Sequence, residues 1–377
     1  MATNRPPGDG SSSDNDSFGR QVPESVIEAQ QLVRTHSKME RRKLLRYLGV
    51  GTVALAAGGA VLSQISREDP SAVAAAMNDL GDGLKMLGTN GALTVSWYAQ
   101  GKDTMQHWCD IFGIELTWID GQGDGNKQRA SLDSAANRNW DLAGVTPATA
   151  GTIVDPVNTM AANGTGVFEM TSNIGGPDDR VNTLSSITQS SYLMGYQVGK
   201  LLFDSVGGRG TVINTRGVPG GSDEAGRYEG FHAALKEYPG MQLLTEDFAR
   251  WDRSRAQDLW QSYLTRFPDI SVAYCQNDDM AFGAMNAIDA AGRTGIKIGG
   301  ADGMPDAIKA VQDGRMLATV RHSSCQIHSL PVILGVAWKL GALDGDIPPK
   351  IDVLGPVVQK DNAASVAFMQ GPGVLYA

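Results

Sequence analysis

Seven polar and aromatic side chains in this 377-residue sequence could together bind a molecule rich in hydroxyl groups, such as a sugar or a polyol. A hydroxyl both donates and accepts, so planar Arg, Asp, Asn and Gln side chains suit paired hydrogen bonds to it. Aromatic faces suit the C–H surface of the same molecule. The candidates are Trp97, Tyr98, Gln100, Arg227, Trp251, Asn277 and Asp302. Core packing is the alternative for each aromatic residue, and a helix cap is the alternative for Asn277 and Asp302.

The elements that would position these residues follow from the apolar pattern, because short apolar runs alternate with segments of helical periodicity from Gly91 onward. We expect strands at 92–96, 115–119, 142–146, 166–170, 211–214, 242–247, 272–276 and 296–300. We expect helices at 104–112, 126–139, 151–163, 192–205, 227–237, 254–267, 279–291 and 304–313. The alternation predicts an α/β fold with parallel sheets covered by helices. Ligands of such sheets bind beyond the carboxyl ends of the strands, where the candidate residues fall.

The first ninety residues differ in composition from the rest of the chain. Residues 1–38 are rich in Ser, Asp, Gly and Pro, which predicts a disordered extension, and Met39 is an alternative start. Basic residues including Arg41-Arg42 precede a weakly apolar, uncharged stretch, which predicts an export signal over 39–65 that resembles the twin-arginine type. A membrane anchor is the alternative. We expect a linker over 66–90 with a short helix at 71–87.

Charge and cysteine content exclude several classes of function. The net charge is -9, and no basic block lies outside 34–46, which argues against binding of nucleic acid. The three cysteines lack the spacing of a zinc site, so we expect buried thiols. Motifs for a nucleophile elbow, a P-loop or a zinc protease are also absent from the sequence. We therefore expect no catalytic residue, no metal and no cofactor.

One segment resembles a known family. Residues 274–284 read Tyr-Cys-Gln-Asn-Asp-Asp-Met-Ala-Phe-Gly-Ala, which resembles a hallmark stretch of type I periplasmic sugar-binding proteins, the ribose-binding-like receptors of ABC importers. The similarity continues over 300–306, 310–314 and 318–320. Upstream, the segment 227–231 resembles the Arg-x-x-Gly-aromatic opening of a helix in the same family. The resemblance covers roughly 92–360 and is most specific over 227–322.

The resemblance implies a fold of two Rossmann-like lobes with parallel sheets, joined by a three-strand hinge, which is the type I periplasmic binding protein fold. The chain would cross between the lobes near Gln189, His322 and Asp352. The N-lobe would then comprise 91–189 plus 323–351, and the C-lobe 190–322 plus 352–377.

The resemblance also implies a role for individual residues. Arg227 matches an Arg that bonds sugar hydroxyls, and Trp251 matches an aromatic residue that packs on the sugar ring. Asn277 matches an Asn after a strand, and Asp302 matches an Asp that binds two hydroxyls. His322 falls where the family often places a Gln that reaches the ligand from a hinge strand.

The first half of the chain departs from the ribose-binding pattern. An Asp-Arg pair is replaced by the uncharged Thr171-Ser172, and an Asn is replaced by Thr146. These departures imply that ribose is not the ligand, whereas another neutral pentose, a hexose or a linear polyol remains open. A nucleoside or a furanosyl signalling compound is a further possibility.

The function implied by the resemblance is that of a monomeric substrate-binding protein of an ABC-type sugar or polyol importer. It would capture a neutral carbohydrate between its lobes, in the periplasm or cell envelope, and present it to the permease. A sensory or chemotaxis receptor of the same fold is an alternative. An exported carbohydrate-active enzyme, with an acid and a base among Asp278, Asp279 and Asp302, is another.

Overall fold

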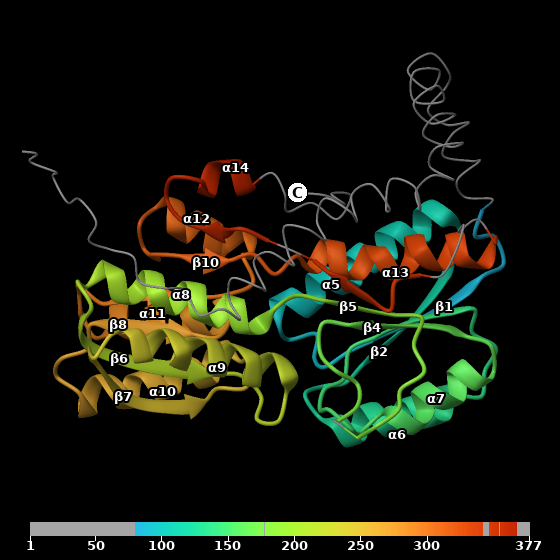
Figure 1. Cartoon of the computed structure of the whole chain (residues 1–377), viewed down its shortest axis with the longest axis horizontal. Coiled ribbons are helices and arrows are strands. Elements are labelled where there is room, and N and C mark those ends of the chain that lie inside the picture. The colour runs from blue at the N-terminus through green and yellow to red at the C-terminus, as the bar shows by residue number, and fades with distance from the viewer. Residues whose placement is uncertain (1–79, 177, 342–346, 354, 368–377) are drawn as a thin grey trace, which may run out of the picture. The chain divides into compact units, whose positions relative to one another are not determined.

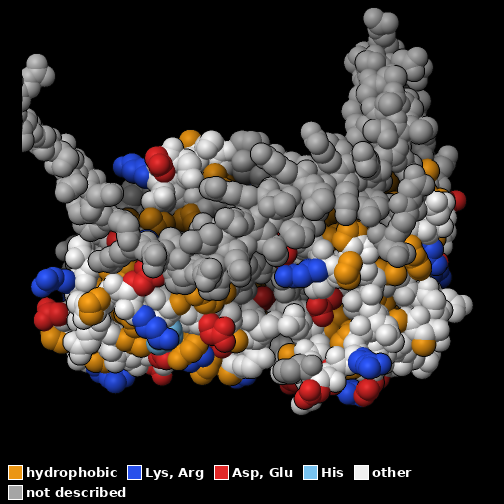
Figure 2. Space-filling model, viewed as in Figure 1, with side chains coloured by type: hydrophobic (Ala, Val, Ile, Leu, Met, Phe, Trp, Pro, Cys, Tyr) orange, Lys and Arg blue, Asp and Glu red, His pale blue; other side chains and the backbone are white. Residues whose placement is uncertain are grey.

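The computed structural model describes residues 80–176, 178–341, 347–353 and 355–367. The predicted extension at 1–38, the predicted export signal at 39–65 and most of the predicted linker lie outside these residues. No helix in the described part of the chain is both long and apolar enough to cross a membrane. Lys and Arg side chains are intermixed with Asp and Glu over the described part of the face shown in Figure 2.

The first sheet has six parallel strands in the order β11-β5-β4-β3-β1-β2. Its strands are β1 (Lys85–Asn90), β2 (Glu115–Asp120), β3 (Leu142–Val145), β4 (Gly166–Met170), β5 (Ser185–Thr188) and β11 (Lys350–Asp352). Its helices are α5 (Ser96–Phe112), α6 (Gly125–Ala135), α7 (Val154–Ala162) and α13 (Ser324–Lys339). Successive strand residues point to opposite faces, so Met86 packs with α5 and α13 while Leu87 packs with α6 and α7 (Figure 1). We call these elements the N-lobe.

The second sheet has four parallel strands in the order β7-β6-β8-β9. Its strands are β6 (Arg209–Arg216), β7 (Gly240–Phe248), β8 (Val272–Cys275) and β9 (Lys297–Gly299). Its helices are α8 (Ser191–Ser205), α9 (Ser222–Glu237), α10 (Arg253–Arg266), α11 (Asp278–Ala290) and α12 (Pro305–Gln312). A short antiparallel pair, β10 (Thr319–Val320) with β12 (Val357–Val358), and helix α14 (Ala363–Ala367) complete what we call the C-lobe. In it α8 packs on α9, and α10 packs on α11 (Figure 1).

The chain passes between the two sheets three times: after β5, after β10 and between β11 and β12. Hydrogen bonds tie these crossings together. The Gln189 side chain donates to the Arg321 carbonyl at 2.9 Å, and the Arg321 N–H donates to the Pro356 carbonyl at 2.9 Å. The Val353 N–H donates to the Thr188 carbonyl at 2.7 Å. The predicted α/β fold of two Rossmann-like lobes is confirmed.

The predicted strand at 92–96 is wrong. The first strand is β1, which lies inside the segment predicted to be a linker, and Ser96 begins helix α5. The sequence obscured this helix because Gly101, a poor helix former, interrupts its first half. The structure gives the reason for the glycine: a Cβ at this position would lie 2.2 Å from Cε1 of His328, a buried residue of α13. Sequence patterning also missed β5 and α13, the latter because it contains Pro331.

His328 should make the stability of the protein sensitive to acid. Its Nδ1–H donates to the Ser324 carbonyl at 2.8 Å, and burial lowers its pKa from 6.5 to about 4, with a smaller contribution from neighbouring His322. The folded state therefore disfavours the protonated ring. Its stabilising contribution is complete above about pH 6.5 and is lost as the pH falls towards 4.

Urea unfolding at pH 7.5 and pH 4.5 tests this expectation. The wild type should lose about 2 to 3 kcal/mol more than a His328→Gln variant between these two pH values. Equal losses in the two proteins would show that His328 does not control the acid sensitivity.

The three cysteines, Cys109, Cys275 and Cys325, are buried and form no disulfide in the described part of the chain.

Candidate ligand-binding site

Seven of the eight predicted site residues meet in one small chamber between the N-lobe and the C-lobe. The chamber has a volume of about 20 Å³, close to what one water molecule needs. Its lining consists of Val95, Trp97, Tyr98, Thr171, Asp223, Arg227, Trp251, Asn277, Asp302 and His322. We call it the inner chamber. It lies where the carboxyl ends of the strands in both sheets face each other, as expected for this class of fold.

Arg227 is the central cation of the inner chamber. It is 3% exposed, and its guanidinium donates to the Asp302 carboxylate at 3.2 Å, to the Gln276 carbonyl, and to Nδ1 of His322 at 3.2 Å. Because arginine can only donate, Nδ1 of His322 accepts and the imidazole proton lies on Nε2. The Nε of Arg227 is buried and has no hydrogen-bond partner among the described residues.

The hydrogen-bond chain continues from His322 into the N-lobe. His322 Nε2 lies 3.0 Å from the hydroxyl of Thr171, and this hydroxyl donates to Asp223 at 3.2 Å. The Ser172 hydroxyl donates to the same carboxylate at 2.6 Å. Thus the uncharged pair in the N-lobe is complemented by an acidic side chain from the C-lobe. Asp223 was not among the predicted site residues, although it falls between the strand predicted at 211–214 and the helix predicted at 227–237.

Asn277, Asp278 and Asp302 have different roles at the starts of helices α11 and α12. Asn277 caps α11, since its side chain accepts from the Met280 N–H at 2.9 Å. Asp302 does not cap α12, because the Met304 N–H at that helix start donates instead to Asp278 at 2.8 Å. Burial and the nearby Asp302 charge raise the pKa of Asp278 well above its usual value. Asp302 thus keeps its carboxylate for Arg227 and the chamber.

Trp97 is fixed by the hinge. Its ring stacks on His322 with centroids 4.5 Å apart, and its indole N–H donates to the His322 carbonyl at 2.7 Å. Trp97 is 4% exposed, so most of its surface serves packing and only an edge reaches the chamber. Tyr98 and Trp251 are half-buried and present their rings to the chamber from the N-lobe and the C-lobe.

Gln100 does not join the site. It lines neither chamber described here, and its carbonyl accepts from the Thr104 hydroxyl within α5. Gln100 was predicted to lie between a strand and a helix, whereas it lies within helix α5. Two helical residues after Tyr98, its side chain is rotated by about 200° from that of Tyr98 and points elsewhere.

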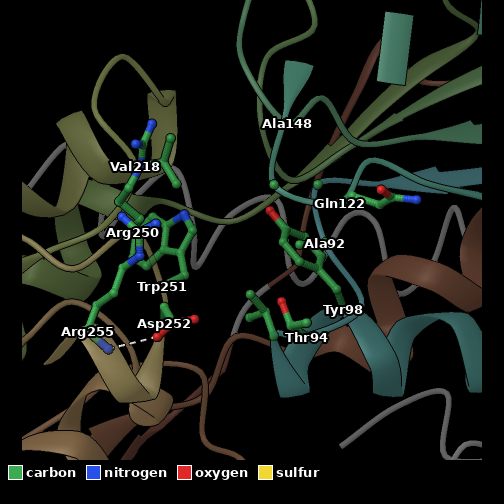
Figure 3. A pocket seen from close by; sticks show the side chains of 13 residues that line it. Ala92, Thr94, Tyr98, Gln122, Ala148, Val218, Arg250, Trp251, Asp252 and Arg255 are labelled. Atoms are coloured by element: carbon green, nitrogen blue, oxygen red, sulfur yellow. Dashed lines mark hydrogen bonds between the residues drawn. The ribbon is translucent and has the colours of Figure 1, made fainter. Parts of the chain in front are cut away.

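A second and larger cavity of about 220 Å³ lies beside the inner chamber and shares Val95, Tyr98 and Trp251 with it. We call it the outer chamber. In Figure 3, Val218, Arg250, Trp251, Asp252 and Arg255 form one wall and Ala92, Thr94, Tyr98, Gln122 and Ala148 form the other. The two walls belong to the C-lobe and the N-lobe, respectively.

Unusual backbone conformations concentrate at these chambers. Five non-glycine residues in the described part of the chain have positive φ: Gln122, Thr171, Arg250, Trp251 and Asp302. Each of them lines the inner or the outer chamber. For Asp302, φ is 115°, a region that side chains rarely adopt. Such strain persists only where the surrounding structure enforces it, and it commonly marks ligand sites.

A group of hydrogen bonds centred on Asp279 joins the lobes next to the inner chamber. Helix α5 has Val95 at its N-cap, which provides no capping side chain, and the cap is supplied by Asp279 of the C-lobe. The Asp279 carboxylate accepts from the Ser96 N–H at 2.9 Å and from the Ser96 hydroxyl at 2.6 Å, and it pairs with Arg253 at 2.8 Å. Closure of the lobes therefore satisfies a helix terminus that would otherwise lack a capping side chain.

Removing the hydrogen bonds between Asp279 and Ser96 should favour separation of the two lobes in the unliganded protein. An Asp279→Ala variant should lose about 1 to 2 kcal/mol of interlobe contact, which raises the ratio of open to closed molecules about tenfold. Small-angle X-ray scattering should show a larger radius of gyration for this variant. Asp258→Ala, an exposed change on α10, is the matched control. Identical scattering from the variant and the wild type would rule out a role for Asp279 in closure.

Comparison with known proteins places the chain in a family. Residues 89–326 match the family model described as "Periplasmic binding protein domain". The xylitol-binding protein of Mycolicibacterium smegmatis is 29% identical over 269 residues, which cover 71% of this chain and 75% of that protein. The ribose import binding protein of Escherichia coli is 29% identical over 226 residues, which cover 60% of this chain and 75% of that protein.

A solved structure adds to these matches. The ABC transporter solute binding protein of Mycobacterium smegmatis with bound glycerol is similar with a TM-score of 0.69 and 26% identity, over 78% of this chain and 99% of that chain. The family model alone spans more than half of the sequence, from β1 to the start of α13. The chain described here therefore belongs to the periplasmic binding protein family.

Proposed function

We propose that this protein is the substrate-binding component of an ABC-type importer and that it captures a sugar or a polyol between its lobes. The observation that carries the proposal is the inner chamber, where the buried pair of Arg227 and Asp302 lies beside the rings of Tyr98 and Trp251. A guanidinium and a carboxylate offer both a donor and an acceptor to vicinal hydroxyls. The aromatic rings offer surfaces for the C–H face of the same ligand.

The proposed ligand residues are Trp97, Tyr98, Arg227, Trp251, Asn277, Asp302 and His322, with Thr171 and Asp223 added from the structure. Because they come from both lobes, ligand contacts favour the closed state over the open one. The inner chamber has room for about one water molecule. A sugar therefore enters while the lobes are apart, or its ring extends into the outer chamber. The closed, loaded protein would then present the ligand to the permease as a monomer.

The relatives supply the first ligands to test. Purified protein would be screened by thermal shift against xylitol, D-ribose, D-allose, galactofuranose, myo-inositol and glycerol. A ligand at one hundred times its Kd adds about 2.7 kcal/mol to the free energy of unfolding, which raises Tm by several degrees. An Arg227→Gln variant should show no such rise. A wild-type protein whose Tm is raised neither by these ligands nor by their phosphate esters would contradict the proposed function.

We also propose export, with the pair Arg41-Arg42 read by the twin-arginine pathway. The proposal rests on the sequence and on membership of a family of periplasmic binding proteins. Changing both arginines to lysine should leave the protein inside the cell, as measured by fractionation. Unchanged export of this variant would exclude a twin-arginine signal.

A further inference from the structure

The outer chamber carries a charge pattern that the proposed function does not explain. Arg250 and Arg255 both line it, and within the described residues neither guanidinium has a hydrogen bond or an ion pair. Other arginines near the cleft are paired: Arg216 with Glu224, Arg227 with Asp302, and Arg253 with Asp279. Two guanidinium groups that have no partner among the described residues, on one wall of a cavity, can bind an anionic group of a ligand.

The inner and outer chambers have opposite charge balance. In the inner chamber the single guanidinium of Arg227 faces two carboxylates, Asp223 and Asp302. The described residues that line the outer chamber include two arginines, Arg250 and Arg255, and one aspartate, Asp252. The Asp252 carboxylate caps helix α10, because it accepts a hydrogen bond from the backbone N–H of Arg255 at 2.8 Å. An anionic group is therefore repelled by the inner chamber and attracted by the outer one.

The two chambers adjoin each other, since Val95, Tyr98 and Trp251 line both. One ligand can therefore have hydroxyl groups in the inner chamber and a charged substituent in the outer chamber. The outer chamber, at about 220 Å³, provides more room than the inner one. The backbone supports this placement, because Arg250 and Trp251 both have positive φ, 60° and 64°, which holds this wall in an unusual conformation.

We propose that the outer chamber is a subsite for a phosphate monoester, so that the preferred ligand is a phosphorylated sugar or polyol. Guanidinium groups bind phosphate through paired, charge-assisted hydrogen bonds, and two of them can share its oxygens. The inference rests on the proposed function, because the hydroxyl-bearing part of the ligand occupies the inner chamber. It replaces the neutral ligand expected from the sequence. The overall charge of -9 does not oppose it, because the local cations lie nearer to the substituent than a Debye length.

Calorimetric titration with matched pairs of probes tests the subsite. The pairs are D-ribose with D-ribose 5-phosphate and xylitol with xylitol 5-phosphate, and xylonate is added to distinguish a carboxylate from a phosphate. For the wild type, the phosphorylated probe of at least one pair should bind about tenfold or more tightly than its neutral partner. This preference should weaken as salt is raised, because Arg250 and Arg255 are exposed.

A double variant and its control locate the effect. Arg250→Gln with Arg255→Gln should reduce the affinity ratio of phosphorylated to neutral probe to near one. Arg266→Gln, at the far end of the same helix α10, should retain the ratio of the wild type. Loss of the ratio in the Arg266 variant as well would show a general charge effect and would overturn the subsite.

The outcomes separate this inference from the proposed function. Neutral probes that bind as tightly as their phosphates overturn the phosphate subsite and leave the proposed function standing. Tighter binding of xylonate than of xylitol 5-phosphate overturns the assignment to phosphate. If none of these probes binds and no ligand of the thermal-shift panel raises the Tm, both the phosphate subsite and the proposed function are contradicted.

Discussion

Replacing Arg227 with glutamine is expected to weaken binding of the ligand by about 100-fold or more, equivalent to about 2.7 kcal/mol. The change removes a charged donor from the centre of the inner chamber. It also removes the hydrogen bond that sets the imidazole of His322 and, through it, the hydroxyl of Thr171. Isothermal titration with a ligand identified by the thermal-shift screen measures the loss.

The same change should also destabilise the unliganded protein, by about 2 kcal/mol or more, because the carboxylate of Asp302 remains buried without its cation. An Arg227→Gln, Asp302→Asn double variant should recover part of the stability without recovering affinity. Arg138→Gln, an exposed change, serves as a control for both measurements. Full affinity in the Arg227 variant would remove this residue from the site.

Replacing Gly230 with alanine is expected to destabilise the protein by about 3 kcal/mol or more. A Cβ at this position would lie 1.9 Å from the carbonyl oxygen of Tyr192 in the facing helix α8. Because that oxygen belongs to the backbone, the helices themselves must separate. Gly195 of α8 has the reciprocal relation, since its Cβ would lie 2.1 Å from the carbonyl oxygen of Arg227. The crossing of α8 and α9 therefore depends on two glycines.

Urea unfolding measures the effect, and Glu229→Ala on the exposed side of α9 is the matched control. Both variants place an alanine in the same helix, and the gain in helix propensity, about 1 kcal/mol for the glycine, works against the expected loss. A Gly230 variant as stable as the Glu229 variant would show that the crossing tolerates a methyl group. This crossing also explains the Arg-x-x-Gly-aromatic pattern: Arg227 serves the chamber, Gly230 the crossing, and Phe231 the core, where it stacks on Tyr274.

Much of the fold could be predicted from the sequence because burial within one element leaves a periodic pattern. Strands β2, β3, β4, β6, β7, β8 and β9 lie at or within two residues of their predicted limits. The errors have local physical causes. Helix α5 contains a glycine that makes room for His328, and α13 contains a proline, so both depart from the expected helical composition. Helix α9 begins at Ser222, so Arg227 lies in its second turn and not at its start.

The sequence by itself determined the α/β class, the family resemblance and, apart from Asp223, the residues of the C-lobe that meet in the inner chamber. Asn277 and Asp302 lie just beyond the ends of strands β8 and β9, and the geometry of a parallel sheet brings such positions to one edge. For the N-lobe, the sequence identified Trp97 and Tyr98 as candidates, but it did not identify Thr171. Gln100 lies on helix α5, two residues beyond Tyr98, and lines neither chamber.

Only the tertiary structure decided the contacts between the lobes. Asp223 binds Thr171 and Ser172 from about fifty positions away, and Asp279 caps α5 at Ser96 across 183 positions. Arg250 and Arg255 become candidates for ligand binding only because they line a cavity whose other wall belongs to the N-lobe. Periodicity reports how each element is buried in its own lobe. The partners of a side chain across the cleft depend on how the three hinge crossings align two separate sheets, and no local pattern encodes that alignment.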